Sequence, residues 1–437
     1  MNISQFETFC SSIGLSGPEA QTLKEELDKI ELSSSPSSSS LSLACKAAQL
    51  CIGPDNPTSK ADVAKAIKII KYFNVKFALR SGGHSPNPGW SSTAGGILVD
   101  LQKLHQVTLS GDKKVASLGP GARWGDVIAT LDTQGTSVIG GRIPAVGVGG
   151  LILGGGFWHF SGEFGMAADN VKNFEVVLAN GTVVNANAGE NSDLFWALKG
   201  GGPNFGVVTR FDLYTIPVRE IWYQFAVYPV EQAFAIFDAF VQWQKEGASD
   251  LKSTVGLIIS LDNIVVGLMY SAPADHPPAF APFYSLEPPL MFAVPATNGT
   301  VGLLTRFLSN TFSKEPLRYL YKDVYTFWRE RALQVRETTG AIQTFTIQPI
   351  PKNLAEQGIA KGGNPMGIPR EDHQCLPTRE RNLDLPFLFM NDASRDQNPL
   401  ASYGPENVEK LRQISRKYDE DQLFQNQQND GFLLSKV

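Results

Sequence analysis

The sequence has 437 residues, and its 38 Lys and Arg residues against 43 Asp and Glu residues give a formal net charge of −5. Hydrophobic residues make up 42% of the chain and charged residues 19%, which excludes a disordered chain, a collagen and a coiled coil. At roughly 150 residues a domain, two or three domains are expected. The acidic balance argues against nucleic acid or a polybasic membrane surface as partner.

Targeting and redox features are sparse. The N-terminus lacks a basic segment followed by an apolar one, and no run of about 18 apolar residues occurs, so we expect no signal peptide and no membrane span. On these grounds the protein is expected in the cytoplasm. The four cysteines, Cys10, Cys45, Cys51 and Cys375, are expected to be unpaired or locally paired. The histidines are scattered, so no metal site is expected.

The chain begins with a peripheral segment, residues 1–40. Pro18–Ile30 is predicted as a polar helix, and Ser33–Ser40 as a flexible stretch. Regular alternation starts at Ser59, where Ser59-Lys60-Ala61-Asp62 resembles a capping box and opens a helix that runs through Tyr72. Strands are then predicted at Val75–Leu79, Gly96–Leu101 and Val115–Leu118, and a helix at Trp124–Gln134.

Further elements follow a glycine-rich stretch. Phe174–Val184 is predicted as a hairpin that turns at Asn180-Gly181, Asp193–Lys199 as a short helix and Val207–Tyr214 as a strand. From Ile221 onward, strands at Thr254–Ser260 and Ile264–Tyr270 alternate with helices near Val230–Glu246 and Leu317–Val335. This pattern predicts an α+β protein whose second half is an antiparallel sheet backed by helices. A last helix is predicted at Pro405–Tyr418.

The glycines concentrate in two kinds of segment. Arg80-Ser81-Gly82-Gly83-His84 follows a strand, but it matches neither a dinucleotide-binding nor a P-loop pattern, and for the glycine pair alone a tight turn is favoured. Gly140–Gly156 interleaves glycines with valine, leucine and isoleucine, so it is unlike a polar linker. Buried glycine-rich backbone needs partners for its N–H groups. A wall against a large planar ligand is therefore favoured over a cluster of turns.

These segments resemble the berberine-bridge-enzyme-like oxidoreductases, which belong to the vanillyl-alcohol-oxidase or PCMH-type flavoproteins. The similar segments are Arg80–Ser85, Val146–Gly156, Ala168–Val171 and Asp193–Thr209, in matching order and spacing across about residues 60–217. In the second half, three further segments are similar to fungal members of the family: Gln348–Pro351, Gly362–Gly367, and Tyr418-Asp419 with Phe424.

The resemblance implies a two-subdomain PCMH-type FAD-binding domain over residues 41–218, shortened at its N-terminal part. It further implies a substrate domain over 219–385 and a C-terminal segment, 386–437, that returns to the FAD domain. The shortening is expected to reflect either a reduced first subdomain or an incomplete gene model. Relatives are often secreted, in contrast to the cytoplasmic location that the N-terminus suggests.

The resemblance also implies how FAD is held. His84 is expected to carry the cofactor covalently through a methyl group of the flavin's benzene ring. Ile143 stands where doubly linked relatives have a cysteine, so a single link is expected. The residues expected to contact FAD are Arg80, Ser81, Gly82, Gly83, His84, Ser85, Pro144, Val146, Gly147, Gly149, Gly150, Gly154, Gly155, Asp169, Asn170 and Val208.

The expected activity is hydride transfer from a small organic substrate to the flavin, with O2 as the electron acceptor. The enzyme is expected to be monomeric and to act in fungal secondary metabolism. No catalytic base can be assigned. The tyrosines of the family's C-terminal motif are missing around Asn391, which is either a flavin or substrate contact or a structural loop residue. His159 either faces the substrate or is simply packed. A cyclase without net redox change and a non-catalytic flavin-binding relic remain as alternatives.

Overall fold

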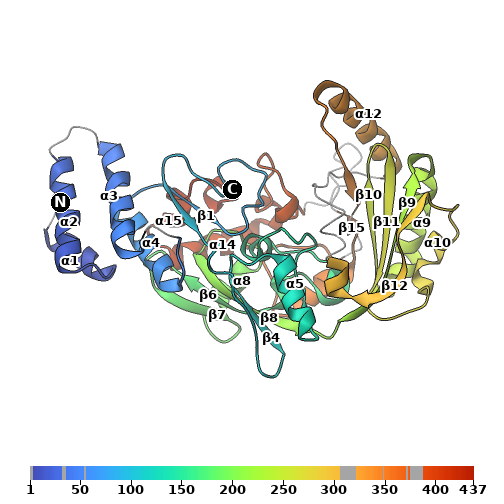
Figure 1. Ribbon diagram of the computed structural model, residues 1–437, viewed down its shortest axis with the longest axis horizontal. Coiled ribbons are helices and arrows are strands. Elements are labelled where there is room, and N and C mark those ends of the chain that lie inside the picture. Colours follow the sequence, from blue (N-terminus) through green and yellow to red (C-terminus); the bar gives the residue numbers. More distant parts are fainter. Residues whose placement is uncertain are drawn as a thin grey trace.

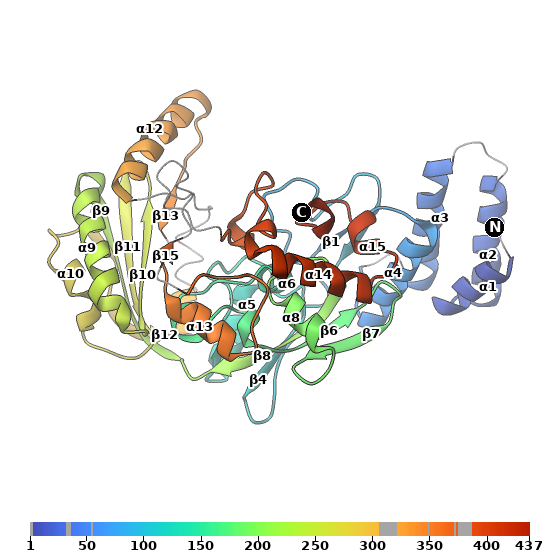
Figure 2. The same ribbon diagram turned by 180° about the vertical axis from the view of Figure 1, so that it is seen from behind.

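A computed structural model describes residues 3–31, 36–53, 56–305, 321–347, 349–370, 373–374 and 387–437. Helices of the N-terminal region lie at one end of the elongated molecule, a five-stranded sheet lies at the other, and a larger sheet lies between them (Figure 1, Figure 2). Four predicted features lie outside the described residues: Cys375, Ser33–Ser35, the start of the helix predicted at Leu317–Val335, and the boundary between residues 385 and 386.

The chain begins with four helices, α1 (Ile3–Ser12), α2 (Gly17–Glu31), α3 (Pro36–Cys51) and α4 (Lys60–Phe73). Their apolar faces share one core, where the rings of Phe9 and Tyr72 stack with centroids 3.7 Å apart. The predicted polar helix is confirmed within α2. The predicted flexible stretch is wrong for residues 36–40, which begin α3. Proline suits a first helical turn, and the buried side chains of Leu43 and Ala47 hold the helix in place.

The capping box at the start of α4 is confirmed. Ser59 Oγ accepts a hydrogen bond from the Asp62 amide at 3.2 Å, and the Asp62 carboxylate accepts one from the Ser59 amide at 3.1 Å. The chain then forms a parallel pair, β1 (Phe77–Arg80) and β2 (Ile97–Asp100). The Phe77 amide donates to the carbonyl of Gln427 at 3.0 Å, so the end of the chain lies directly on β1.

The central sheet is antiparallel, in the order β3-β4-β8-β6-β7, with the short strand β5 paired to β8. The strands are β3 (Val107–Leu109), β4 (Val115–Leu118), β5 (Ser137–Val138), β6 (Val171–Val177), β7 (Val183–Asn187) and β8 (Val207–Ile216). The helices around it are α5 (Trp124–Thr133), α6 (Val148–Leu153), α7 (Ser161–Phe164) and α8 (Ser192–Leu198). The predicted hairpin is confirmed, and Gly181 occupies its turn with a φ of 79°.

The second sheet is also antiparallel, in the order β12-β9-β11-β10-β13. Its strands are β9 (Glu220–Pro229), β10 (Ser253–Ile259), β11 (Asn263–Tyr270), β12 (Met291–Thr300) and β13 (Phe345–Ile347). One face packs on the helices α9 (Ala233–Glu246), α10 (Ala281–Tyr284) and α12 (Tyr321–Thr339) (Figure 2). Tyr223, Phe225 and Met269, on the other face, join the core of the central sheet. The predicted α+β class and helix-backed antiparallel sheet are confirmed.

The final part of the chain runs back over the central sheet. It contains α13 (Lys352–Ala360), the short pair β14 (Pro349–Ile350) and β15 (His373–Gln374), α14 (Pro405–Tyr418) and α15 (Leu423–Asn426). The Asn204 side-chain amide donates to the Phe432 carbonyl at 2.9 Å, and its oxygen accepts from the Leu434 amide at 3.0 Å. The C-terminal segment is thereby joined to the turn that precedes β8.

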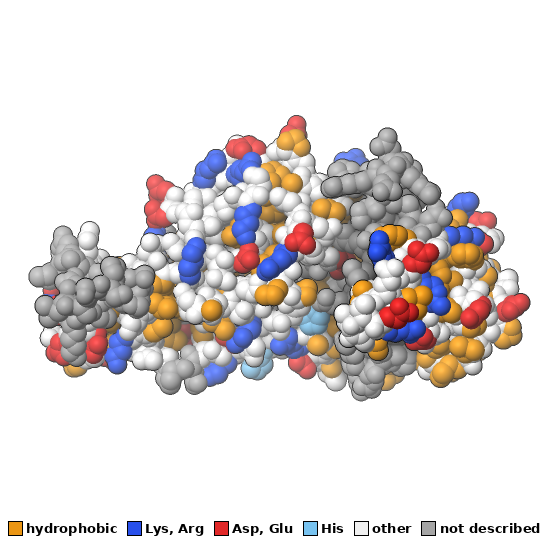
Figure 3. Space-filling model, turned by 90° about the horizontal axis from the view of Figure 1, so that it is seen from above, with side chains coloured by type: hydrophobic (Ala, Val, Ile, Leu, Met, Phe, Trp, Pro, Cys, Tyr) orange, Lys and Arg blue, Asp and Glu red, His pale blue; other side chains and the backbone are white. Residues whose placement is uncertain are grey.

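Among the residues that the structure describes, no helix is both long and apolar enough to cross a bilayer. In the same residues no group of His, Cys, Asp and Glu is arranged to hold a metal ion. Cys10, Cys45 and Cys51 are unpaired. On the face drawn in Figure 3, basic and acidic side chains are interspersed over the middle of the molecule.

Candidate functional site

The first glycine loop leaves the end of β1 and is anchored at its base. Arg80 binds the buried carboxylate of Asp100 with Nη2 2.7 Å from Oδ2. Ser81 Oγ donates to the Pro120 carbonyl and accepts from the Gly149 amide at 3.2 Å. Gly83 then takes a φ of 62°, a conformation that a side chain would disfavour. The turn presents His84 on the surface, exposed and without a hydrogen bond to any described residue.

The two glycine segments touch backbone to backbone. A Cβ atom added to Gly82 would lie 2.4 Å from the amide nitrogen of Gly147, and one added to Gly147 would lie 2.4 Å from the amide nitrogen of Gly82. Real Cβ atoms do not approach other atoms this closely, so only glycine allows this contact at either position. The conformation of the His84 loop and that of the second loop are therefore fixed together.

Arg123 ties the same two loops from the side of α5. Its Nη1 donates to the carbonyl of Gly82 and, at 2.7 Å, to the carbonyl of Ala145. The Trp124 amide donates to the Val146 carbonyl at 3.0 Å, and the next amide donates to the Pro144 carbonyl at 3.0 Å. The second loop is thus held along its length before it enters α6.

The glycines after α6 are enclosed by other parts of the chain. Gly155 and Gly156 have φ values of 109° and 74°. Asn391, from the C-terminal segment, lies against Gly154 and makes hydrogen bonds on both sides of it, to the Gly150 carbonyl at 3.2 Å and from the Gly156 amide at 3.0 Å. Gly150, by contrast, is exposed, and an added Cβ would meet no atom within 4 Å.

Comparison with known proteins gives this arrangement a family. Residues 55–187 match the family described as FAD binding domain, and residues 381–429 match the one described as berberine and berberine like. An FAD-dependent monooxygenase of Arthrobotrys oligospora is 37% identical over 422 residues, which cover 87% of this chain and 82% of that protein. The chain belongs to the berberine-bridge-enzyme-like family of FAD-linked oxidoreductases.

Other similarities agree with this family. An FAD-dependent monooxygenase of Fusarium proliferatum is 35% identical over 418 residues, with 83% of this chain and 81% of that protein covered. The fold is similar to that of a xylooligosaccharide oxidase from Myceliophthora thermophila, with a TM-score of 0.70 and 23% identity over 86% of this chain and 90% of that one. The chain is therefore an FAD-dependent oxidoreductase, as expected from its sequence.

The residues present fit a flavin cofactor. The exposed imidazole of His84 offers a ring nitrogen for a bond, because no described residue occupies it. The open space over Gly150 lets a planar ring approach the backbone of α6, three residues beyond the Gly82–Gly147 contact. A large ligand can therefore lie against both loops without displacing a described side chain from Gly150.

The structure brings most of the predicted contact residues together. The segments Arg80–Ser85, Pro144–Gly150 and Gly154–Gly155 form one continuous assembly through the contacts above. Val208 lies on β8, in the same hydrophobic core as Val148 and Ile152 of α6. Ile143 occupies the position before Pro144, and the unpaired cysteines lie on α1 and α3.

Asp169 and Asn170 differ, since their side-chain atoms face other protein groups. Asp169 is 2% exposed and accepts hydrogen bonds from the Met166 amide at 3.0 Å and from Asn364 at 2.9 Å. Lys361 Nζ donates to Asn170 Oδ1 at 2.7 Å. Burial raises the pKa of Asp169 and lowers that of Lys361. The contacts of these two residues hold the short helical turn Ala168–Asn170 against the segment that follows α13.

His159 is half-buried at the junction of the two sheets. Its backbone carbonyl accepts a hydrogen bond from Thr254 of β10 at 2.6 Å, and Trp243 and Pro351 line the same small cavity. Burial and the nearby positive charge of Arg142 lower the pKa of this imidazole to about 3. His159 is therefore neutral near pH 7 and is too weakly basic to accept a substrate proton efficiently.

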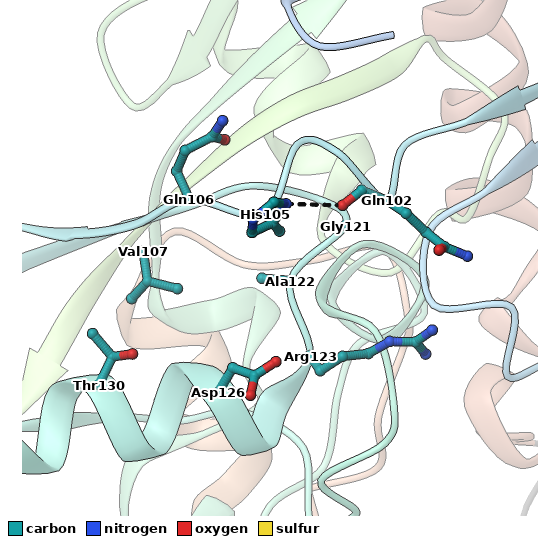
Figure 4. A pocket seen from close by; sticks show the side chains of 9 residues that line it. All are labelled: Gln102, His105, Gln106, Val107, Gly121, Ala122, Arg123, Asp126 and Thr130. Atoms are coloured by element: carbon teal, nitrogen blue, oxygen red, sulfur yellow. Dashed lines mark hydrogen bonds between the residues drawn. The ribbon is translucent and has the colours of Figure 1, made fainter. Parts of the chain in front are cut away.

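A second cavity lies behind the loops, on the side of α5. This groove of about 480 Å3 is lined by Gln102, His105, Gln106, Val107, Gly121, Ala122, Arg123, Asp126 and Thr130, and the Arg123 side chain extends away from Asp126 (Figure 4). His105 Nδ1 lies 3.1 Å from the Gln102 carbonyl. None of the predicted flavin contacts lines this groove, but it borders the assembly around His84, because Arg123 lines it and also binds Gly82 and Ala145.

Sequence reasoning missed Arg123. The residue stands immediately before α5 without capping that helix through its side chain, and its guanidinium turns back to two loop carbonyls. The sequence shows a charged residue between Gly121-Ala122 and Trp124. The direction in which its side chain points depends on how the two loops pack, which no local pattern specifies.

Proposed function

We propose that the chain oxidises a small organic molecule, with an FAD held covalently by His84 and O2 as the final electron acceptor. FAD supplies the capacity to accept a hydride from a substrate carbon and to pass the electrons on. The observation that carries the proposal is the exposed, unbonded imidazole of His84 on a loop locked to the second glycine segment. A role in fungal secondary metabolism is part of the proposal, because the similar proteins are fungal monooxygenases.

In this proposal the chain's own residues orient the cofactor and exclude water. Gly82, Gly83 and Ser85 shape the turn at His84, and Gly150 leaves the backbone open to close approach by the cofactor. The remaining glycines let the loop pack against other parts of the chain (Gly147, Gly149, Gly154 and Gly155). Ile143 leaves the cofactor with a single covalent link. The FAD-binding part would span residues 41–218 and the substrate part 219–385.

The substrate side of the proposal rests on the second sheet. Alternate residues of a strand share one face, and the register aligns Tyr223, Phe225 and Val227 of β9 with positions on β11 and β10 of the same face. On this face Tyr223, Phe225 and Met269 are buried in the core of the central sheet. The positions that remain partly accessible are Val227, Val265, Thr254, Gly256 and Ile258, and none of them is charged. Such a surface favours a largely apolar substrate over a highly polar one.

The proposal is tested by the visible spectrum of the purified protein. Absorbance near 450 nm should remain with the protein after acid precipitation, and His84→Ala should release it into the supernatant or lose it during purification. His105→Ala is the matched control, because His105 is also exposed but is not among the residues expected to contact FAD. Rapid reoxidation of the chemically reduced protein by air would support O2 as acceptor.

The same experiment can reject the proposal. A wild-type protein that carries no flavin would contradict the cofactor assignment. Acid-released flavin in the wild type, or acid-stable flavin in His84→Ala, would contradict the covalent link at this residue.

A further inference from the structure

The C-terminal segment reaches the glycine loop after α6 through Asn391, beside Phe389, whose ring lies against Gly155. Asn391 follows Phe389, a buried aromatic residue, in the short helical turn Met390–Asp392. Its amide group reaches the glycine loop that follows α6, more than two hundred residues earlier in the chain. The contact is therefore set by the return of the chain across the central sheet.

The amide group uses both of its ends. Nδ2 donates to the carbonyl of Gly150 at 3.2 Å, and Oδ1 accepts from the amide of Gly156 at 3.0 Å. An amide is the side-chain group that can donate at one end and accept at the other within this span. A carboxylate would keep the bond from Gly156 but would place an acceptor against the carbonyl of Gly150.

The fit between Asn391 and the loop is close. A Cβ atom added to Gly154 would lie 2.2 Å from Asn391 Nδ2, 2.8 Å from Cγ and 3.1 Å from Oδ1, and these are the three nearest atoms it would meet. Gly154 has a φ of −91°, which other residues adopt readily, so a side chain there would displace Asn391 and would not strain the backbone. The missing side chain of Gly154 makes the seat for Asn391.

We propose that Asn391 is a positioning residue for the flavin, which it places by holding Gly150 and Gly156 at a fixed separation. This inference rests on the proposed function, since it assumes that the open backbone at Gly150 is the surface against which the flavin lies. Asn391 reaches the loop carbonyl from one side and leaves the exposed face of Gly150 open. Its role differs from the substrate or flavin contact considered from the sequence.

The test compares Asn391→Ala, Asn391→Asp and Asn398→Ala in the full chain. Asn398 is the matched control, because it lies in the same segment and bonds to Lys436 and Ala401 but not to the glycine loop. FAD affinity is measured in the His84→Ala background, where binding is reversible. In that background we expect the added substitution Asn391→Ala to weaken FAD binding roughly tenfold. We expect Asn391→Asp to show a similar loss, and Asn398→Ala to match wild type.

A double-mutant cycle separates positioning from general stability. Gly154→Ala should displace the flavin spectrum and lower flavin content when Asn391 is present, and it should have little further effect when Asn391 is alanine. Full additivity of the two substitutions, or wild-type flavin binding and spectrum in Asn391→Ala, would overturn the inference. Absence of flavin from the wild type would instead overturn the proposed function, so the two failures are distinguishable.

Discussion

At the residue scale, His159 shows how burial removes a side chain from acid–base chemistry. The residue directly follows the second glycine loop, and its position in the sequence suggested a place on the substrate side. Its pKa of about 3, lowered by burial and by Arg142, leaves it uncharged over the range in which most proteins work. The residue that accepts the substrate proton must therefore be sought elsewhere in the site.

The depressed pKa of His159 predicts a pH dependence of stability. The unfolded chain takes up a proton on this residue below about pH 6.5, and the folded chain does so only near pH 3, so stability falls as the pH drops between these values. The free energy of unfolding of wild type should fall from pH 6.5 to 5 by up to about 2 kcal/mol more than that of His159→Gln. Urea unfolding of both proteins at the two pH values measures this difference, and equal pH dependence would contradict the assignment.

At the element scale, the two glycine loops behave as one unit because their backbones touch at Gly82 and Gly147. Gly82→Ala is expected to force the loops apart, with a loss of stability of about 1–3 kcal/mol and of acid-stable flavin. Thermal unfolding and the protein-bound absorbance measure the two effects. Gly111→Ala is the control, because an added Cβ there meets no atom within 4 Å. Unchanged stability and flavin in Gly82→Ala would show that the contact is not required.

The elements also show which parts of the fold can be read from the sequence. The capping box of α4, the hairpin at Asn180-Gly181 and the helix Pro405–Tyr418 are local signals, and the structure has all three. β9 was not identified, because its continuous apolar run is buried on both faces and lacks the alternation of a half-buried strand. β12 is an edge strand interrupted by Pro295, and its pairing with β9 contains two register shifts.

For the site, the sequence predicted the loops but not the side chains that join them. The glycine pattern and the family resemblance predict residues 80–85 and 144–155 as cofactor contacts, and the structure brings these loops together. The bonds of Arg123 to Gly82 and of Asn391 to Gly150 and Gly156 depend on how distant segments meet, so no local pattern specifies them. The hydrogen bond of Asp169 with Asn364, in the segment after α13, arises in the same way.

At the scale of the whole molecule, the C-terminal segment closes the structure over the central sheet. Asn204 is fully buried, and its side chain makes four hydrogen bonds, to Gly201, Phe432, Leu434 and Gln425. These bonds join the turn before β8 to the last residues of the chain. The C-terminal segment, which carries Asn391, is therefore also held in place at Asn204 through Phe432 and Leu434.

This anchoring predicts a large effect of Asn204→Ala. The substitution leaves buried donors and acceptors without partners, and it should lower the free energy of unfolding by about 3 kcal/mol. Chemical unfolding measures this loss against that of Asn398→Ala, where Asn398 is an exposed asparagine of the C-terminal segment. A loss no larger than that of the control would show that the C-terminal segment is held mainly by its apolar contacts.

The mass of the denatured protein shows whether His84 holds the flavin. We expect the intact chain to carry the added mass of one FAD, the adduct to map to the peptide that contains His84, and no second link to occur near Ile143. An unmodified His84 peptide, with all of the flavin recovered free in solution, would contradict this expectation.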